Sequence, residues 1–281
     1  MKIQNNLITN FNFQEGNLVI PQNVIGFDEM VEGLRIISSI KSITVEEGNP
    51  VYHSAGDCLI ETATKKLVLG GDNSVIPDDG SVTSIGFDAF CMREAVKTLN
   101  LPNSITTIGA RAFNGIGIEE LRLPQSVKCI GALAFMNCMG LKRVVLPSNI
   151  EEIGDGAFCG TYQNVCEFVL DESNPTYRVE NGCIIERTTN KLIAAPINAV
   201  IPEGVRTIGA LTFNGMWHCQ EVYIPSSVTE FEEDFYERHP FFICGGIGNR
   251  NLTIKSPKGS AAIQFAKQNN IKYVEVSGIT E

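Results

Sequence analysis

A motif that recurs at intervals of 22 to 25 residues, with one interval of 55, constrains the fold of this chain more than any other feature. In each copy an aliphatic residue is followed by proline, and most copies then carry Ile-Gly and Ala-Phe at fixed distances. The prolines that mark the six copies are Pro77, Pro102, Pro124, Pro147, Pro202 and Pro225. One unit of this length cannot bury its apolar side chains alone, so the repeat predicts a solenoid whose core is shared between neighbouring coils.

Each copy is expected to begin with a short β-strand. In residues 141–147 apolar side chains alternate with polar or variable ones, which is typical of a strand with one buried face. Pro147 then ends the strand, because proline cannot donate a hydrogen bond to a neighbouring strand. Stacking of these strands predicts a β-rich solenoid.

The second half of each copy is expected to turn the chain and to fill the core. Gly154 is expected to adopt a backbone conformation closed to other residues. The Ala-Phe pair that follows predicts a short helical or 3-10 turn, with the phenylalanine between coils. The phenylalanines expected to be buried and stacked in register are Phe113, Phe135 and Phe158.

A second repeat explains the interval of 55 residues. An Asn-Pro-x-Tyr motif begins at Asn49 and recurs at Asn174, 125 residues later. Alternating Tyr, Val, Cys and Ile residues around glycine and a polar turn follow both copies. These features predict two β-hairpin inserts, near residues 49–70 and 174–195.

We expect one solenoid domain over residues 1–281. Residues 1–45 are expected to form an N-terminal cap and first coil, residues 46–251 the repeats with their hairpins, and residues 252–281 a C-terminal cap. Caps are needed because a terminal coil otherwise exposes the shared core. Open strand edges at the two ends predict a monomer or weak end-to-end association.

Both caps carry a helix signal. Asp28 is a candidate N-cap for a helix whose apolar residues share one face. Ser260 is a candidate N-cap for a helix over residues 261–268, and a final strand is expected over residues 273–276.

The charge balance excludes two classes of partner. Lys and Arg number 22 against 32 Asp and Glu, which gives a formal net charge of -10. Nonspecific nucleic-acid binding and attraction to an anionic membrane both need clustered Lys and Arg. No apolar run approaches the length that spans a bilayer. We therefore expect neither a nucleic-acid partner nor a membrane span.

The cysteines and the start of the chain bear on location. The nine cysteines cannot all pair within one chain, and none are spaced as in a structural zinc site, so we interpret them as buried free thiols. Free thiols fit a reducing compartment. No apolar stretch with a cleavage site follows Met1, so the residues alone predict no signal peptide and a cytoplasmic location.

The combined motif, Leu-Pro-x-x-Ile-x-x-Ile-Gly-x-x-Ala-Phe, resembles the BspA-like leucine-rich repeat family over about residues 18 to 276. The Asn-Pro-x-Tyr inserts, and the Gly259-Ser260 ending before a last strand, are similar to that family too. The resemblance implies a leucine-rich repeat solenoid. It further implies a surface-associated or secreted protein of bacteria or some protists, used in adhesion to a host or cell-surface protein or a glycan.

No catalytic motif stands out. The chain lacks Gly-x-Ser-x-Gly, His-Glu-x-x-His and a phosphate-binding loop, so we expect no enzyme activity and no cofactor. The alternative is a metal-dependent or hydrolytic site near the acidic run of residues 230–237 and the glycine-rich residues 245–248. That run lacks the alternating layout of a calcium loop and is also typical of a solvated surface.

The outward positions of the stacked strands are the candidate binding surface. One column contains Arg122, Val145 and Tyr223 and is expected to end at Thr253; the other contains Glu120, Arg143, Glu167 and Glu221 and is expected to end at Asn251. Arginine and tyrosine dominate binding energy at protein interfaces. Of these residues, Arg122, Arg143 and Tyr223 are therefore the predicted hot spots. The alternative is an ordinary solvated sheet face.

Overall fold

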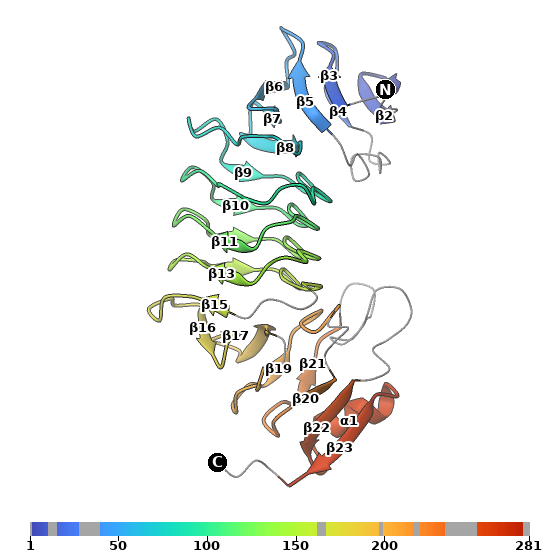
Figure 1. Cartoon of the computed structure of the whole chain (residues 1–281), viewed down its shortest axis with the longest axis vertical. Coiled ribbons are helices and arrows are strands. Elements are labelled where there is room, and N and C mark those ends of the chain that lie inside the picture. The colour runs from blue at the N-terminus through green and yellow to red at the C-terminus, as the bar shows by residue number, and fades with distance from the viewer. Residues whose placement is uncertain are drawn as a thin grey trace.

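The predicted solenoid is confirmed. The computed structural model describes residues 2–10, 16–27, 40–161, 167–196, 199–215, 220–233 and 252–277. Short strands stack coil on coil along the long axis of the molecule, from β2 near one end to β23 at the other (Figure 1). Each coil packs against the next, so neighbouring coils share an apolar core, as the repeat predicts.

One stack of parallel strands carries the candidate binding residues. It consists of β11 (Glu120–Arg122), β13 (Arg143–Val145) and β15 (Glu167–Val169), paired without a register shift. The middle side chain of each strand is buried and the flanking ones face outward. We call the outward side of these three strands the strand face.

A second stack joins the predicted hairpin near residues 49–70 to four short strands that were not predicted. It is a seven-stranded sheet in the order β14-β12-β10-β9-β8-β7-β6. Its members are β6 (Tyr52–Ala55), β7 (Cys58–Glu61), β8 (Lys66–Gly70), β9 (Ser84–Ile85), β10 (Thr107–Ile108), β12 (Cys129–Ile130) and β14 (Glu152–Ile153). In the last four strands the isoleucine of each Ile-Gly pair is buried, so both stacks close over one core.

The ends of the molecule are built from smaller sheets. At the N-terminal end lie β1 (Lys2–Gln4), β2 (Leu7–Asn10), β3 (Gly16–Ile20), β4 (Gly26–Phe27) and β5 (Ile40–Val45). Toward the C-terminal end lie β16 (Tyr177–Glu180), β17 (Cys183–Glu186), β18 (Lys191–Ala194), β19 (Thr207–Ile208), β20 (Glu221–Tyr223), β21 (Glu230–Phe231), β22 (Thr253–Pro257), α1 (Ala261–Gln268) and β23 (Lys272–Val276).

The C-terminal cap forms as expected. The Ser260 side chain accepts a hydrogen bond from the Ile263 amide at 3.3 Å and so begins α1. The buried face of α1 packs on β22 and β23. The helix expected after Asp28 lies outside the described residues.

The Ala-Phe segments are hydrogen-bonded turns rather than short helices. The residue before each alanine is in the left-handed region, with φ of 56° at Arg111 and 59° at Leu133. A left-handed residue cannot continue a right-handed helix. In the described part of the chain, α1 is therefore the only helix.

The phenylalanines stack as predicted. Ring centroids lie 5.3 Å apart for Phe90 and Phe113, 5.4 Å for Phe113 and Phe135, and 5.8 Å for Phe135 and Phe158. The rings are nearly parallel and buried, so one aromatic column crosses four coils.

The explanation expected for the repeat glycine is wrong. Neither Gly131 nor Gly154 has a positive φ. Instead a Cβ at Gly131 would lie 2.5 Å from the Ala110 nitrogen, and one at Gly154 would lie 2.4 Å from the Ala132 nitrogen. The glycines are needed because the backbone of the preceding coil approaches too closely for a side chain.

We therefore expect Gly131→Ala to lower the free energy of unfolding by about 1–3 kcal/mol, because two coils must separate to admit the methyl group. The matched control is Gly140→Ala, whose Cβ would lie 3.0 Å from its nearest neighbour, the Ile118 oxygen. Urea denaturation should show a clearly smaller loss for the control. Equal losses would contradict the close-approach explanation.

The two predicted hairpins are confirmed, and they divide the core. In β7 the side chain of Leu59 packs in the N-terminal cluster, whereas Cys58 and Ile60 pack in the central one. In β17 the side chain of Ile184 packs in the central cluster, whereas Cys183 belongs to the C-terminal one. The strands β7 and β17 are thus buried on both faces, and each separates two of the three apolar clusters.

Candidate functional site

An ion-pair network links the three strands of the strand face. The Arg143 Nη1 atom lies 2.9 Å from Glu120 Oε1, and its Nε atom lies 2.6 Å from Glu167 Oε2. Arg122 Nη2 lies 2.8 Å from the same Glu120 oxygen. The pairing follows from the register, which places Glu120, Arg143 and Glu167 side by side on adjacent strands. These hydrogen bonds, that to Glu167 first, raise the pKa of Arg143.

Arg122 is the cation of this network with the most unused donors. Its guanidinium contacts one carboxylate, and its side chain is 64% exposed. Val145 and Val169 continue its column on β13 and β15, and both are half-buried. The strand face therefore combines a guanidinium with an adjacent apolar strip, an arrangement suited to a partner with an acidic and an apolar group.

Tyr223 and Glu221 lie on a different sheet from these residues. They belong to β20, which pairs with β22 and not with β15. The expected end of their columns is wrong, because Glu221 pairs with Thr253 and Tyr223 pairs with Lys255. The aliphatic residues of the last coil mislead the alignment by two positions: Ile254, not Leu252, is the partner of Val222.

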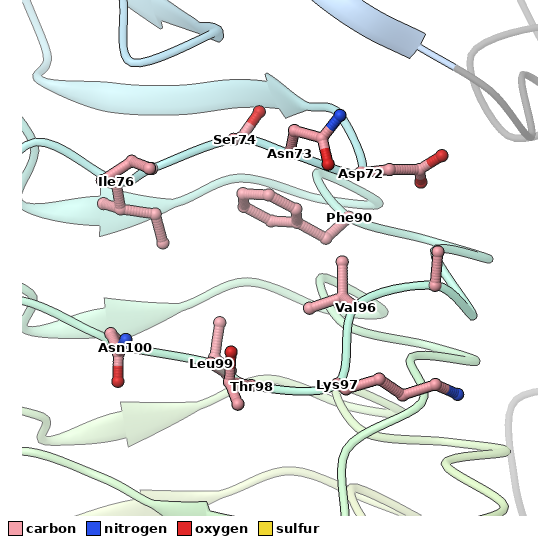
Figure 2. Close-up of a pocket in the computed structure, with 12 residues that line it drawn as sticks. Asp72, Asn73, Ser74, Ile76, Phe90, Val96, Lys97, Thr98, Leu99 and Asn100 are labelled. Carbon is pink, nitrogen blue, oxygen red and sulfur yellow. The ribbon is translucent and has the colours of Figure 1, made fainter.

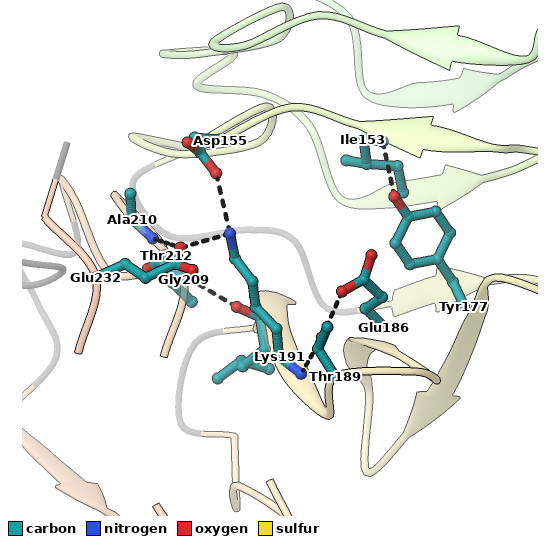
Figure 3. Close-up of polar contacts among 11 residues, drawn as sticks. Ile153, Asp155, Tyr177, Glu186, Thr189, Lys191, Gly209, Ala210, Thr212 and Glu232 are labelled. Carbon is teal, nitrogen blue, oxygen red and sulfur yellow. Dashed lines mark hydrogen bonds and ion pairs between the residues drawn. The ribbon is translucent and has the colours of Figure 1, made fainter. Parts of the chain in front are cut away.

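In the described part of the acidic run, Glu230 and Glu232 contact other side chains of the same protein. Lys191 on β18 contacts Glu232 and lies 3.5 Å from Asp155 of the preceding coil (Figure 3). Burial opposes the charged form of this lysine, but the two carboxylates outweigh it and raise its pKa. Residues 234–237 and 245–248 lie outside the described part. Within that part, no three His, Cys, Asp or Glu side chains are grouped to hold a metal ion.

A family model describes most of this repeat. The model for the BspA-type leucine-rich repeat region matches residues 72–179 and 195–242 in six copies, more than half of the chain. The chain belongs to the BspA-type leucine-rich repeat family.

Solved structures share the leucine-rich repeat fold. A leucine-rich repeat protein from Eubacterium ventriosum aligns with a TM-score of 0.54 at 21% identity, over 84% of this chain. The pneumococcal vaccine antigen PcpA aligns with a TM-score of 0.50 at 18% identity, over 94% of this chain. In each case the chain covers 56% of the other protein. A comparison with curated protein sequences finds no match.

The Asn-Pro-x-Tyr motif of this BspA-type chain anchors each hairpin to the coil before it. The Asn174 amide donates to the Ser148 and Ile150 oxygens at 2.8 and 3.0 Å, and its oxygen accepts from the Thr176 and Tyr177 amides. The Asn49 amide donates in the same way, to Pro21 and Val24. The sequence showed that the motif recurs, but not that its asparagine ties two coils together.

The tyrosine of the second motif bridges a break between sheets. The Ile153 amide donates to the Tyr177 hydroxyl at 3.0 Å (Figure 3), on the side where β14 has no strand partner among the described residues. We expect Tyr177→Phe to cost about 1–3 kcal/mol of unfolding free energy, because it leaves a buried amide unpaired. Thermal unfolding measures this, with the exposed Tyr273→Phe as control. A loss no larger than the control's would show that the bridge contributes nothing.

The six cysteines in the described part of the chain are thiols and not disulfides, and five of them are buried. Burial raises the pKa of Cys58, Cys138 and Cys183 to about 12. Because only the thiolate reacts, less than about one in a thousand of these groups is reactive at pH 8. Iodoacetamide should therefore leave all three unmodified in the native protein and label them after denaturation. Native labelling within minutes would contradict their burial.

The surface of the described part of the chain also has two hollows. One hollow of about 390 Å³ lies between residues 72–76 and 95–100, and one of about 500 Å³ lies between Met92 and Met139. None of the helices that the structure describes is long and apolar enough to cross a membrane.

Proposed function

We propose that this chain is a non-catalytic interaction module that binds a partner protein on the strand face. One observation carries the proposal: Arg122, with unused donors, stands beside the apolar strip of Val145 and Val169. A solenoid presents such a surface across several coils, and BspA-type repeats are typically scaffolds rather than enzymes. Arginine beside apolar surface is typical of the energetic centre of an interface.

The finer proposal is an adhesin-type role at a bacterial cell surface. The structural similarity to a pneumococcal vaccine antigen supports it. The partner we propose is a host or cell-surface protein that offers a carboxylate to Arg122 and an aliphatic or aromatic side chain to Val145.

Arg143 has a supporting role in this proposal. Its Nε and Nη1 atoms each donate to a carboxylate, so in this proposal Arg143 orders Glu120 and Glu167, and Arg122 meets the partner. Tyr223, on the separate β20 sheet, is a second and independent contact point at most.

The proposal is tested with Arg122→Ala and a panel of purified host extracellular and cell-surface proteins. Binding of the full chain to the panel is measured by biolayer interferometry. For a captured partner we expect Arg122→Ala to raise Kd at least tenfold, about 1.4 kcal/mol, with little change in melting temperature.

The matched control is Lys128→Ala. Lys128 is also an exposed cation in an ion pair, with Glu151 at 2.8 Å, but it lies beside β12 of the second sheet. Its removal should leave Kd unchanged. A partner that binds Arg122→Ala as tightly as the parent, or that loses as much affinity with Lys128→Ala, contradicts the assignment to the strand face.

A further inference from the structure

The stack of strands that forms the strand face ends at β11, and the coils before it continue the same position without strand pairing. Counting back from the repeat prolines, residues 72–76 and 97–101 occupy the positions of β11 in the two preceding coils. Neither segment pairs as a strand. Within the described part of the chain, no backbone hydrogen bond involves residues 97–101, although the corresponding residues of β11 and β13 are paired. An unpaired extended segment is a template for strand addition.

A hollow separates these two segments. It measures about 390 Å³, and Figure 2 shows Phe90 and Val96 between the two walls. We call it the coil gap, lined by residues 72–76, 95–100 and Phe90.

The sequence explains why the gap is there. Three residues before its proline, each of the next coils carries Leu99, Leu121 or Val144, whereas this coil carries Ser74. The Ser74 hydroxyl donates to the Asp57 backbone oxygen in the hairpin at 2.6 Å and accepts from the Gly71 amide at 2.7 Å, so it bonds to nearby backbone groups and sends no apolar group across. The core is thus one aliphatic side chain short at this level.

Two charged residues, Lys97 and Asp72, line the gap. Lys97 lies at one end of its lower wall (Figure 2), and its exposed side chain reaches toward Gly117 of the next coil, where a Cβ would lie 2.5 Å from the Lys97 Nζ atom. Asp72, on the opposite wall, lies 3.9 Å from the Nε atom of the buried Arg93, and this ion pair partly neutralises its charge. An acidic group on an incoming segment is therefore complementary to Lys97.

We propose that the coil gap receives an extended segment of a partner protein as an added strand. The segment pairs its backbone with residues 97–101, places an aliphatic side chain against Phe90, Val96 and Leu99, and places an acidic residue beside Lys97. The three requirements come from three separate features: unpaired backbone, missing core volume and the exposed charge of Lys97. This site is distinct from Arg122, and it stands whether or not the strand-face proposal holds.

The test uses synthetic nonapeptides on a threonine-rich host. The central residue is Gly, Val or Leu, and the residue two positions before it is Asp, Ser or Lys. We expect binding to the full chain to strengthen from Gly to Leu and from Lys to Asp. Methylation of the central amide should weaken it at least tenfold, because it removes a strand hydrogen bond. On peptide binding, hydrogen exchange of amides 98–100 should slow at least tenfold.

Two variants fix the location. Val96→Phe fills the gap and should abolish peptide binding without lowering the melting temperature. Lys97→Glu should reverse the preference from Asp to Lys, whereas Lys258→Glu, an equal charge change on a distant exposed turn, should not. The proposal is overturned if no peptide binds, if the methylated peptide binds equally well, or if amides 98–100 exchange at unchanged rates.

Discussion

Replacement of Phe135 by alanine should lower the free energy of unfolding by about 3–5 kcal/mol. Its ring is fully buried and lies in the middle of the aromatic column, 5.4 Å from Phe113 and 5.8 Å from Phe158. Truncation leaves a cavity between two neighbouring coils. The turns on both sides contain residues in the left-handed region, and their fixed geometry limits how far the coils can close the cavity. Chemical denaturation followed by circular dichroism measures the loss.

The control for this variant is Phe87→Ala, because Phe87 belongs to the same repeat region but is 54% exposed. Its loss should stay below about 1 kcal/mol, since a partly exposed side chain leaves no closed cavity. If the two variants lost equal stability, or if Phe135→Ala unfolded like the parent, the shared aromatic core would be wrong.

The second large effect is expected for Asn174→Ala, which should cost at least about 3 kcal/mol. The side chain is 1% exposed and makes four hydrogen bonds to backbone groups, two in the preceding coil and two at the start of the hairpin. Removing it leaves several buried backbone groups without partners, and each such group costs about 1–3 kcal/mol.

Asn149→Ala is the comparison for Asn174→Ala. Asn149 is exposed beside the carbonyl groups that Asn174 binds, so its replacement should change stability by about 0.5 kcal/mol or less. A similar loss in the two variants would show that Asn174 does not anchor the hairpin.

Much of the fold was predictable from the sequence, because the repeat supplies many copies of the same local signal. The proline spacing predicted the solenoid, and the offset of 125 residues predicted both hairpins. The phenylalanine column followed because one residue type recurs at one position of each coil. The Ser260 cap followed from a local rule that depends on few neighbours.

The features that the sequence did not predict depend on distances between coils. Gly154 was expected to be needed for its backbone conformation, but it is needed because an atom of another coil lies close, which no local pattern reveals. The register of β22 was misjudged because Leu252 and Ile254 are both aliphatic. The ion pairs of Arg143 were missed for a related reason. The sequence indicates that Arg143, Glu120 and Glu167 face outward, but not that they lie side by side on adjacent strands and pair with one another.

The candidate site was predictable only as a set of outward positions. The sequence placed Arg122, Arg143 and Glu120 on one face, and the structure agrees. It grouped Tyr223 with them because the repeat positions match, whereas the structure places Tyr223 on a separate sheet. Repeat position predicts which way a side chain faces, but not which strands share a sheet.

The central proposal, binding on the strand face, is tested most directly by site-specific photocrosslinking. A photoreactive phenylalanine is placed at Val145 of the strand face in one protein and at Lys128 of the second sheet in another. Each is irradiated with a partner captured by the parent chain. We predict a crosslinked partner from position 145 and none from position 128. Crosslinking from position 128 alone would contradict the proposal.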